Sequence, residues 1–420
     1  MKILYHHRTR AGDAQGIHIA EIQRAFRLRG HEVVEVALVE AGAEARADAE
    51  GGAARGFGGL AGLAARAAAR LPRAAREAME LAYNAVAYRR LVAAIRRHRP
   101  DFVYERYAAN TFAGLAAARR SRLPFVLEVN SPLAREKAEH DGLAFRRPTA
   151  AIERRLRAGA DATIAVTGVL ARILAADGVP AGKVTVMPNG VRRGFGDGAT
   201  AAAGAAFRHA LGLPPEAVVA GFVGWFRAWH GLERLLDAAA SPEWRAAGIH
   251  LVLAGDGPAM PALRERRAAL GLADRVTLCG AVPRADLEAA LAAFDVAVQP
   301  AVTPWACPMK ILEYMAAGRA IVAPGSDNVR ELLADGATAL LCPAGENPAM
   351  PETIDLQAAV LRLARDPGLR RRLGGAARRQ VEDAGLYWEE NARRVEELVM
   401  SARDVQGTAA VVRTREVTTC

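Results

Sequence analysis

The sequence is poor in lysine. Only Lys2, Lys137, Lys183 and Lys310 occur among 56 basic residues, so arginine carries almost all of the net charge of +10. This preference for arginine, with abundant alanine and glycine, is also typical of GC-rich coding, so the charge alone is weak evidence for a nucleic-acid partner. The positive balance does suit an anionic small-molecule substrate or an acidic lipid surface.

Cysteine is scarce and unclustered. The four thiols, Cys279, Cys307, Cys342 and Cys420, show no CxxC spacing and have no histidine cluster beside them. A disulfide framework and a structural zinc site are therefore disfavoured, and we interpret the cysteines as structural thiols.

Long apolar runs and an export signal are also missing. No stretch of about eighteen uncharged apolar residues exists, so no membrane-spanning helix is predicted. The first ten residues, MKILYHHRTR, combine one short apolar patch with histidine and arginine, unlike a signal peptide. We expect a cytoplasmic protein, and 420 residues suffice for two α/β domains.

The most informative stretch is residues 303–331, TPWACPMKILEYMAAGRAIVAPGSDNVRE. The pattern predicts a Pro-rich loop, a helix that starts near Pro308 and ends at Gly318, and then a short buried strand. Lys310 and Glu313 are three residues apart, so both can project from one face of the helix near its N-terminus. A helix N-terminus favours anions, and an ionised carboxylate accepts hydrogen bonds from a diol, so the pair suits a nucleotide with phosphate beside Lys310 and ribose at Glu313.

An ordinary surface Lys–Glu pair on an amphipathic helix explains the same spacing. A resemblance to a known family favours the nucleotide-binding interpretation over the surface ion pair. Residues 309–319, MKILEYMAAGR, resemble the characteristic helix of retaining glycosyltransferases of family 4, and the likeness extends over roughly residues 1–400. In that family the carboxylate at the position of Glu313 binds the ribose of a nucleotide sugar.

The resemblance implies an α/β chain of GT-B fold. This fold has two facing Rossmann-like domains with parallel sheets and a C-terminal helix that crosses back to the N-terminal domain. We place an acceptor domain at residues 1–195, a nucleotide-sugar domain at 196–385, the crossover helix at 386–404 and a flexible tail at 405–420.

The loop after the strand predicted at residues 218–223 departs from the family. Its sequence, GWFRAWHG, has Trp225 and His230 where family members usually have an arginine and a lysine that reach the donor diphosphate. Arg227 stands two residues from the first of these, and His230 can donate a hydrogen bond or take up a proton beside phosphates. We therefore predict Arg227, His230 and Lys310 as the catalytic residues that stabilise the leaving diphosphate. Aromatic packing of a strand-to-helix corner is the alternative.

The resemblance predicts that glycines and backbone groups make the remaining contacts with the nucleotide-sugar donor. Trp305 stands where the family has the first of its paired glutamates, so the donor sugar must be held otherwise, through N–H groups at the start of the helix. Glycine lets the backbone approach a ligand closely. Besides Glu313, the predicted donor-binding residues are Gly224, Gly255, Val282, Cys307, Pro308 and Met309.

Polar residues in the first half are expected on the acceptor side. Open α/β sheets bind ligands at the carboxyl ends of their strands, and Glu105 and Asn130 stand at two such ends. Gly16 and His18 belong to the region after the first strand, which faces the acceptor in the family. Many family members have histidine at the position of Asn130, and a lone histidine such as His18 is also common as a structural residue. A full GxGxxG is absent here, so a dehydrogenase is disfavoured.

Residues 60–97 alternate apolar residues with arginine at helical spacing, with a break at Pro72. A basic amphipathic helix of this kind can lie on an anionic membrane. The alternative is that these helices pack on the sheet with arginine in water, because their apolar face is mostly alanine.

Together these features predict a retaining glycosyltransferase that moves a sugar from a nucleoside-diphosphate sugar to an acceptor hydroxyl, in cell-surface polysaccharide or glycolipid synthesis. No DxD triplet occurs, so no metal ion or other cofactor is expected. The expected partners are the nucleotide sugar and a glycan or lipid-linked acceptor at the inner face of the membrane, with no nucleic acid. Two alternatives stay open: a sugar-nucleotide epimerase of the same fold, with Glu105 and Glu128 as acid and base, and a nucleotide-sugar binding protein with little turnover.

Overall fold

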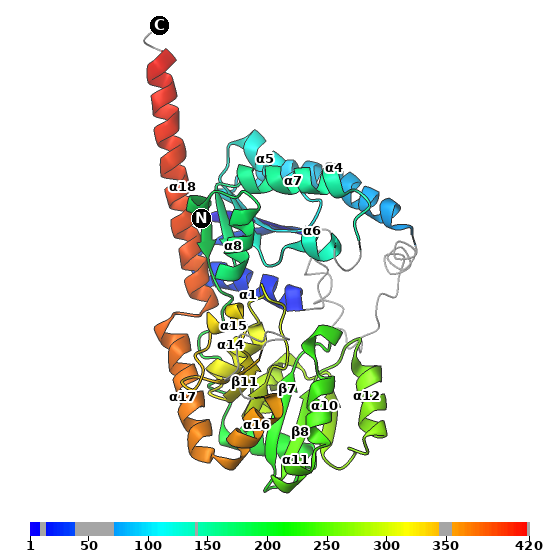
Figure 1. Ribbon diagram of the computed structural model, residues 1–420. Coiled ribbons are helices and arrows are strands. Elements are labelled where there is room, and N and C mark those ends of the chain that lie inside the picture. The colour runs from blue at the N-terminus through cyan, green and yellow to red at the C-terminus, as the bar shows by residue number, and fades with distance from the viewer. Residues whose placement is uncertain (9–13, 38–70, 139–141, 344–354, 418–420) are drawn as a thin grey trace. The chain divides into compact units, whose positions relative to one another are not determined.

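The computed structural model describes residues 1–8, 14–37, 71–138, 142–343 and 355–417, with the backbone alone for Ala14 and residues 404–417 (Figure 1). The chain forms two compact units. Unit 1 comprises Met1–Met187 and Asn391–Cys420, and unit 2 comprises Pro188–Glu390. Each unit is built around one parallel sheet of six strands, so the predicted α/β class and Rossmann-like halves are confirmed.

The sheet of unit 1 has the strand order β2-β1-β3-β4-β5-β6, and every neighbouring pair is parallel. Its strands are mostly buried, which explains why they appear in the sequence as short apolar runs without polar alternation. The strands are β1 (Lys2–His7), β2 (Glu32–Ala37), β3 (Phe102–Arg106), β4 (Phe125–Val129), β5 (Ala162–Ala165) and β6 (Val184–Val186).

Helices connect these strands, as parallel pairing requires. Helix α4 begins directly after Pro72, the residue at which the sequence predicted a break, and the part of that prediction before Leu71 lies outside the described residues. The helices of unit 1 are α1 (Ala14–Leu28), α4 (Arg73–His98), α5 (Ala113–Ser121), α6 (Leu133–Glu136), α7 (Arg146–Gly159) and α8 (Gly168–Ala176), with a 3-10 turn at Ala181–Lys183.

The sheet of unit 2 has the order β12-β11-β10-β7-β8-β9, again parallel throughout. Its strands are β7 (Val218–Val223), β8 (Ile249–Ala254), β9 (Val276–Gly280), β10 (Val296–Val298), β11 (Ala320–Pro324) and β12 (Leu340–Cys342). Its helices are α9 (Ala201–Ala210), α10 (Glu233–Ala239), α11 (Pro242–Ala246), α12 (Met260–Ala269), α13 (Leu287–Ala292), α14 (Met309–Ala316), α15 (Asp327–Arg330), α16 (Leu356–Arg365) and α17 (Pro367–Asp383), with 3-10 turns at Ala228–His230 and Arg284–Asp286.

Two boundaries differ from those expected. Unit 2 begins at Pro188 rather than near residue 196, because Val191 forms a parallel bridge with Tyr387 and the side-chain amide of Asn189 donates to the carbonyl of Cys307 over 2.8 Å. The last helix, α18 (Trp388–Val417), starts within unit 2 and its residues from Asn391 onward group with unit 1. It continues past the predicted end at residue 404, because the segment assigned to a flexible tail contains no proline to stop a helix.

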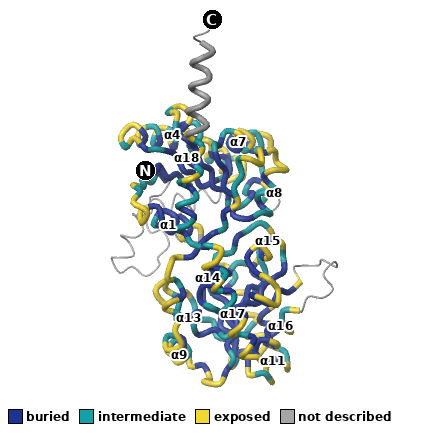
Figure 2. Tube along the Cα trace, turned by 90° about the vertical axis from the view of Figure 1, so that its left-hand side faces the viewer, coloured by how far each residue is buried: buried dark blue, intermediate teal, exposed yellow. Residues whose placement is uncertain are grey.

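Apolar side chains from the sheet and its helices fill the interior of each unit. Figure 2 shows this interior in dark blue and the outer helical surfaces in yellow and teal. In unit 2, Phe222, Phe226 and Trp244 are fully buried and join the apolar cluster around β7 and β8. None of the helices in the described part of the chain combines the length and apolarity that crossing a bilayer requires.

Candidate functional site

Helix α14 carries the predicted donor pair. Pro308 precedes its first residue, and Gly318, with φ +63°, follows its end, as the sequence indicated. The helix is fixed on its inner side because the Tyr314 hydroxyl accepts the backbone N–H of Val223, at the end of β7, over 3.1 Å. Its start is fixed because the Asn328 side chain donates to the carbonyls of the preceding loop at 3.0 and 2.7 Å. The N-terminus of α14 is therefore held beside the carboxyl end of β7, where open α/β sheets bind ligands.

Lys310 and His230 meet at this point. The Lys310 Nζ lies 3.3 Å from His230 Nε2, and the backbone N–H of Arg227 donates to His230 Nδ1 over 3.2 Å. A neutral imidazole that accepts at Nδ1 carries its proton on Nε2, on the side of Lys310. Two donors thus converge on one point, an arrangement that an anionic oxygen would satisfy.

The ionisation of the two groups follows from their surroundings. Burial, together with the cations of Lys310 and Arg227, lowers the pKa of His230 to about 3. Burial also lowers the pKa of Lys310 to about 8, although Glu313 acts in the opposite direction. At neutral pH the site therefore offers one ammonium ion and one neutral N–H donor. His230 is therefore a neutral N–H donor in the free protein, and its charging beside phosphates stays a prediction.

Two glycines make room for this arrangement. A Cβ on Gly224, which has φ +135°, would lie 2.3 Å from Cε of Lys310. A Cβ on Gly255, with φ +152°, would lie 1.9 Å from the carbonyl oxygen of Gly224. Side chains at either position would displace Lys310 or the end of β7, so both glycines serve the geometry of the site whatever they contact in a ligand.

Glu313 lies one turn deeper on α14 and already has a partner. Its carboxylate accepts a hydrogen bond of 2.6 Å from Arg284, which belongs to the 3-10 turn after Val282 and Pro283. The guanidinium of Arg284 also lies over the ring of Phe195, at 5.6 Å. Arg284 was not among the predicted residues, although it follows the predicted donor-binding residue Val282 by two positions.

The predicted residues just before α14 differ in what they offer. Cys307 is buried, its sulfur and carbonyl accept hydrogen bonds from Asn189, and burial raises the pKa of its thiol to about 12. This cysteine is therefore an inert structural thiol. Pro308 has no N–H, so any backbone donor at the helix start comes from Met309 or Lys310.

The aromatic residues of the loop between β7 and α10 divide into two groups. Phe226 is fully buried against Phe222, which agrees with the predicted alternative of corner packing. Trp225 and Trp229 are instead 42% and 56% exposed, and the guanidinium of Arg227 lies over the Trp229 ring at 5.2 Å. Packing explains the phenylalanine but not the tryptophans. Arg227 is partly exposed and is held by stacking.

In unit 1, the predicted acceptor residues His18 and Asn130 meet at Glu128. Its carboxylate accepts hydrogen bonds from the Tyr104 hydroxyl at 2.6 Å, from Arg106 at 2.8 Å and from the Asn130 side chain, and His18 Nε2 lies 3.2 Å away. Burial alone would raise the pKa of Glu128, but His18, Arg106 and the hydrogen bonds together hold it below its usual value. The sequence analysis named Glu128 only as an acid or base of the epimerase alternative, and not as the anionic centre that joins His18 and Asn130.

Glu105 does not join this cluster. The carboxylate has no exposed surface, lies 2.5 Å from His6 Nδ1, and is so close to α5 that a Cβ on Gly114 would contact it. Side chains alternate along a strand, so Tyr104 and Arg106 face Glu128 while Glu105 points to the other side of the sheet. The prediction that Glu105 contacts an acceptor is corrected accordingly. Gly16 lies in the first turn of α1, partly exposed.

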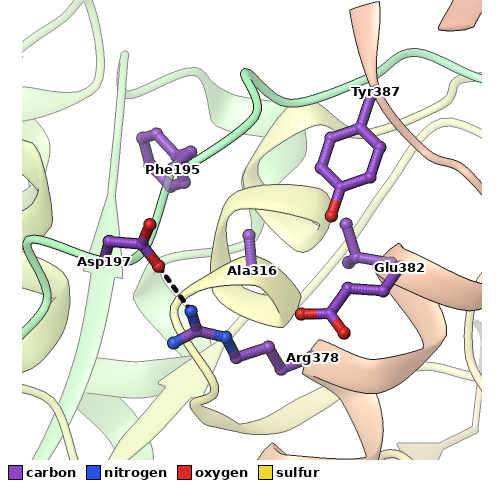
Figure 3. Close-up of a pocket in the computed structure, with 8 residues that line it drawn as sticks. Phe195, Asp197, Ala316, Arg378, Glu382 and Tyr387 are labelled. Atoms are coloured by element: carbon purple, nitrogen blue, oxygen red, sulfur yellow. Dashed lines mark hydrogen bonds and ion pairs between the residues drawn. The ribbon is translucent and has the colours of Figure 1, made fainter.

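A separate small pocket lies at the other end of α14. It is lined by Ala316, by Phe195 and Asp197 of the segment before α9, and by Arg378, Glu382 and Tyr387 (Figure 3). Arg378 and Asp197 form an ion pair of 2.6 Å across its mouth. With about 130 Å³ of space the pocket is too small for a nucleotide, and none of the predicted donor residues lines it. Within the described residues, no group of three or more acidic, histidine or cysteine side chains is arranged to hold a metal ion.

The two parallel six-stranded sheets of this chain are the architecture of the GT-B fold. Solved structures of this architecture match nearly the whole chain. HepE of Anabaena, solved in complex with UDP, superposes with a TM-score of 0.70 at 18% identity over 96% of this chain and 100% of that chain. Sucrose-phosphate synthase of Thermosynechococcus elongatus superposes with a TM-score of 0.68 at 18% identity, over 96% and 99%.

The chain belongs to the group 1, family 4 glycosyltransferases. Residues 15–194 match the family model described as Glycosyltransferase Family 4, and residues 217–366 match the one described as Glycosyl transferases group 1. The chain is 30% identical over 330 residues to a D-inositol 3-phosphate glycosyltransferase of Actinosynnema mirum, covering 74% of this chain and 75% of the relative. It is 33% identical over 179 residues to an alpha-D-kanosaminyltransferase of Streptomyces kanamyceticus, of which it spans only 44%.

Proposed function

We propose that this protein is a retaining glycosyltransferase that moves a sugar from a nucleoside-diphosphate sugar, with UDP as the first nucleotide to test, to an acceptor hydroxyl. The observation that carries the proposal is the convergence of Lys310 Nζ and His230 Nε2, 3.3 Å apart, one helical turn from the Glu313 carboxylate. Phosphate oxygens would be held by the first two groups and a ribose diol by the third. Solved structures of HepE with UDP and with UDP-glucose support the choice of nucleotide.

The chemistry proposed is departure of the nucleoside diphosphate from the anomeric carbon as the acceptor oxygen attacks. Negative charge grows on the leaving phosphate, and Lys310, the His230 N–H and the first turn of α14 are donors placed to stabilise it. Arg227, partly exposed beside the Trp229 ring, adds a cation at the loop. We propose no metal ion, because the sequence has no DxD triplet and these groups supply the needed donors.

The proposal also includes the acceptor and the cellular location of the reaction. We propose a glycan or lipid-linked acceptor in cell-surface polysaccharide or glycolipid synthesis, at the cytoplasmic face of the membrane. Burial of Glu105 and Glu128 argues against the epimerase alternative, because a carboxylate pair that is committed to His6 and Arg106 is not available as acid and base.

The test is to incubate the purified chain with UDP-, GDP- and dTDP-sugars, with and without lipid-linked and soluble acceptors, in the presence of EDTA. Transfer that needs an acceptor, survives EDTA and keeps the anomeric configuration supports the proposal. Conversion of the donor sugar without acceptor indicates an epimerase, and a rise in melting temperature without any product indicates a binding protein.

Donor binding should weaken above about pH 8. The diphosphate is bound by the ammonium form of Lys310, whose pKa of about 8 in the free protein means that binding above this pH takes up a proton. His230, with a pKa of about 3, stays neutral and does not contribute to this dependence. We expect the Kd for UDP to rise up to about tenfold per pH unit between about pH 8 and pH 10. Titration calorimetry measures this, and the Lys310→Arg variant should show a flat profile; an equal slope in both proteins would contradict the assignment.

Replacing Glu313 should separate ribose recognition from phosphate recognition. Loss of hydrogen bonds to an ionised acceptor costs about 1.5–3 kcal/mol, so Glu313→Ala should bind UDP roughly 10- to 150-fold more weakly. Its affinity for inorganic pyrophosphate, which has no ribose, should change little. The control is Glu233→Ala, at an exposed glutamate that begins α10. Arg284→Ala leaves the Glu313 carboxylate in place and should weaken UDP binding less. If Glu313→Ala weakens the binding of UDP and of pyrophosphate equally, Glu313 does not contact the ribose.

A further inference from the structure

The outer surface of the helical layer in unit 1 is strongly basic. Helices α4 and α5 pack side by side, and Figure 1 shows α7 beside them. Glu77 of α4 accepts the backbone N–H groups of Ala144 and Phe145, just before α7, and Gly159 at the end of α7 contacts Leu115 of α5. The exposed arginines of these three helices, called the arginine face below, are Arg73, Arg76, Arg89, Arg96, Arg97, Arg119, Arg120, Arg146, Arg147, Arg154 and Arg155.

No acidic side chain on the same three helices is exposed. Glu77 is buried, and Glu80 and Glu153 are partly buried. All three are committed to internal partners: Glu77 to the backbone groups above, Glu80 to Lys137, and Glu153 to the Tyr107 hydroxyl and Arg157. The positive charge of the arginine face is therefore not neutralised by carboxylates of its own helices. Among the residues that the structure describes, the one carboxylate paired with these arginines is that of Asp161, 3.2 Å from Arg119.

Apolar side chains are exposed among these arginines. Met79 and Val86 are each 52% exposed and are seven residues apart on α4, so they project from the same side of the helix. Phe112, just before α5, is 40% exposed, and its backbone N–H is bound by Asn84 of α4. A helical surface that presents arginines around exposed methionine, valine and phenylalanine has the composition of a segment that lies in a membrane interface.

We propose that the arginine face docks on the surface of an anionic lipid bilayer. The inference rests on the proposed function and extends it, because docking would bring a lipid-linked acceptor to the enzyme. Charge complementarity to acidic headgroups supplies the attraction, roughly fivefold in affinity for each basic residue near the surface. Met79, Val86 and Phe112 favour a bilayer over a nucleic acid, since apolar side chains gain from entering the headgroup boundary but gain little beside phosphates.

The experiment is flotation of the full chain with vesicles of equal parts phosphatidylglycerol and phosphatidylcholine, against vesicles of phosphatidylcholine alone. We expect binding to the anionic vesicles, reduced at about 0.5 M salt because exposed charges are screened. The triple variant Arg89→Glu, Arg96→Glu, Arg97→Glu should lower the partition coefficient roughly a hundredfold or more. The matched control, Arg264→Glu, Arg371→Glu, Arg372→Glu, changes the same charge on exposed positions of unit 2 and should lower it much less.

Two further variants keep the test decisive. Arg89→Gln, Arg96→Gln, Arg97→Gln avoids acidic charge at the end of α4 and should give an intermediate loss, so it replaces the glutamate variant if that one unfolds. Met79→Ser with Val86→Ser should weaken binding while leaving its salt dependence unchanged. Equal losses in the unit 1 and unit 2 triples, equal binding to neutral vesicles, or tighter binding to a short DNA duplex than to vesicles at equal phosphate would each overturn the proposal.

Failure of docking and failure of the proposed function are separable. Vesicle binding is measured without donor, and UDP affinity is measured without vesicles. If the protein transfers sugar to a soluble acceptor but does not bind vesicles, only the docking proposal is wrong. If it binds vesicles but transfers sugar to no acceptor, only the proposed glycosyltransferase activity is contradicted.

Discussion

Lys310→Ala is expected to lower the rate of sugar transfer by roughly 10²- to 10³-fold, as removal of one preorganised donor to a developing anion does in other enzymes. The ammonium lies 3.3 Å from the Nε2 of His230, and the Lys310 side chain packs against Gly224, where a larger residue would displace it. Without it, the leaving phosphate loses the ammonium of Lys310 and keeps the His230 N–H, the first turn of α14 and the cation of Arg227. Because the charge on that phosphate grows as the sugar departs, kcat should fall by more than KM rises.

Steady-state kinetics with a donor and acceptor pair from the substrate screen would measure this effect. Lys310→Arg keeps the charge and should recover part of the rate, whereas Lys310→Met keeps the approximate size and should not. Lys183→Ala serves as a control, because this lysine donates to the carbonyls of Ala158 and Ala160 in unit 1. A Lys310→Met protein with near wild-type kcat would remove this residue from the mechanism.

Glu128→Ala is expected to destabilise the protein by about 3–5 kcal/mol, the cost of leaving a buried charge without its partner. The guanidinium of Arg106, whose side chain is only 8% exposed, would lose its 2.8 Å ion pair, and the Tyr104 hydroxyl would lose its acceptor. Urea unfolding followed by circular dichroism measures the change. Glu265→Ala, an exposed glutamate on α12, should stay within about 0.5 kcal/mol of wild type.

The pH dependence gives an independent check on Glu128. The folded protein holds the pKa of this carboxyl below its usual value of 4.5, so its contribution to stability is present above about pH 4.5 and is lost as the pH falls through the folded pKa. The wild type should therefore lose stability on acidification more steeply than Glu128→Gln. A combined Glu128→Leu, Arg106→Met protein should regain much of the loss, because it leaves no unpaired charge.

The local features of the donor helix could be predicted from the sequence because they depend on neighbours along the chain. Pro308 and Gly318 mark the start and the end of α14, and the three-residue spacing of Lys310 and Glu313 fixes their common face. The strand pattern was equally readable, since apolar runs followed by glycines are typical of buried parallel strands. These signals were sufficient for the fold class.

The partners of those residues could not be predicted, because they depend on sheet order. Arg284 reaches Glu313 from 29 positions away, and Glu105 is paired with His6 because β1 and β3 are neighbours in the sheet. At the end of β3, the sequence shows three polar or aromatic residues in a row, all compatible with a ligand site. Strand alternation separates Glu105 from Tyr104 and Arg106, but which of the two sets faces the ligand side depends on the neighbouring strands.

The scarcity of lysine makes the donor site accessible to selective chemical labelling at Lys310. Lys2, Lys137 and Lys183 are each engaged by carboxylates or carbonyl oxygens, whereas Lys310 sheds its proton near pH 8 and then presents a free amine lone pair. The chain has only four lysines, so an acylating reagent applied at mildly alkaline pH should modify few amines besides Lys310 and the N-terminal amine. A bound nucleotide would shield the Lys310 amine, so a fall in the acylation of Lys310 would report that the donor site is occupied.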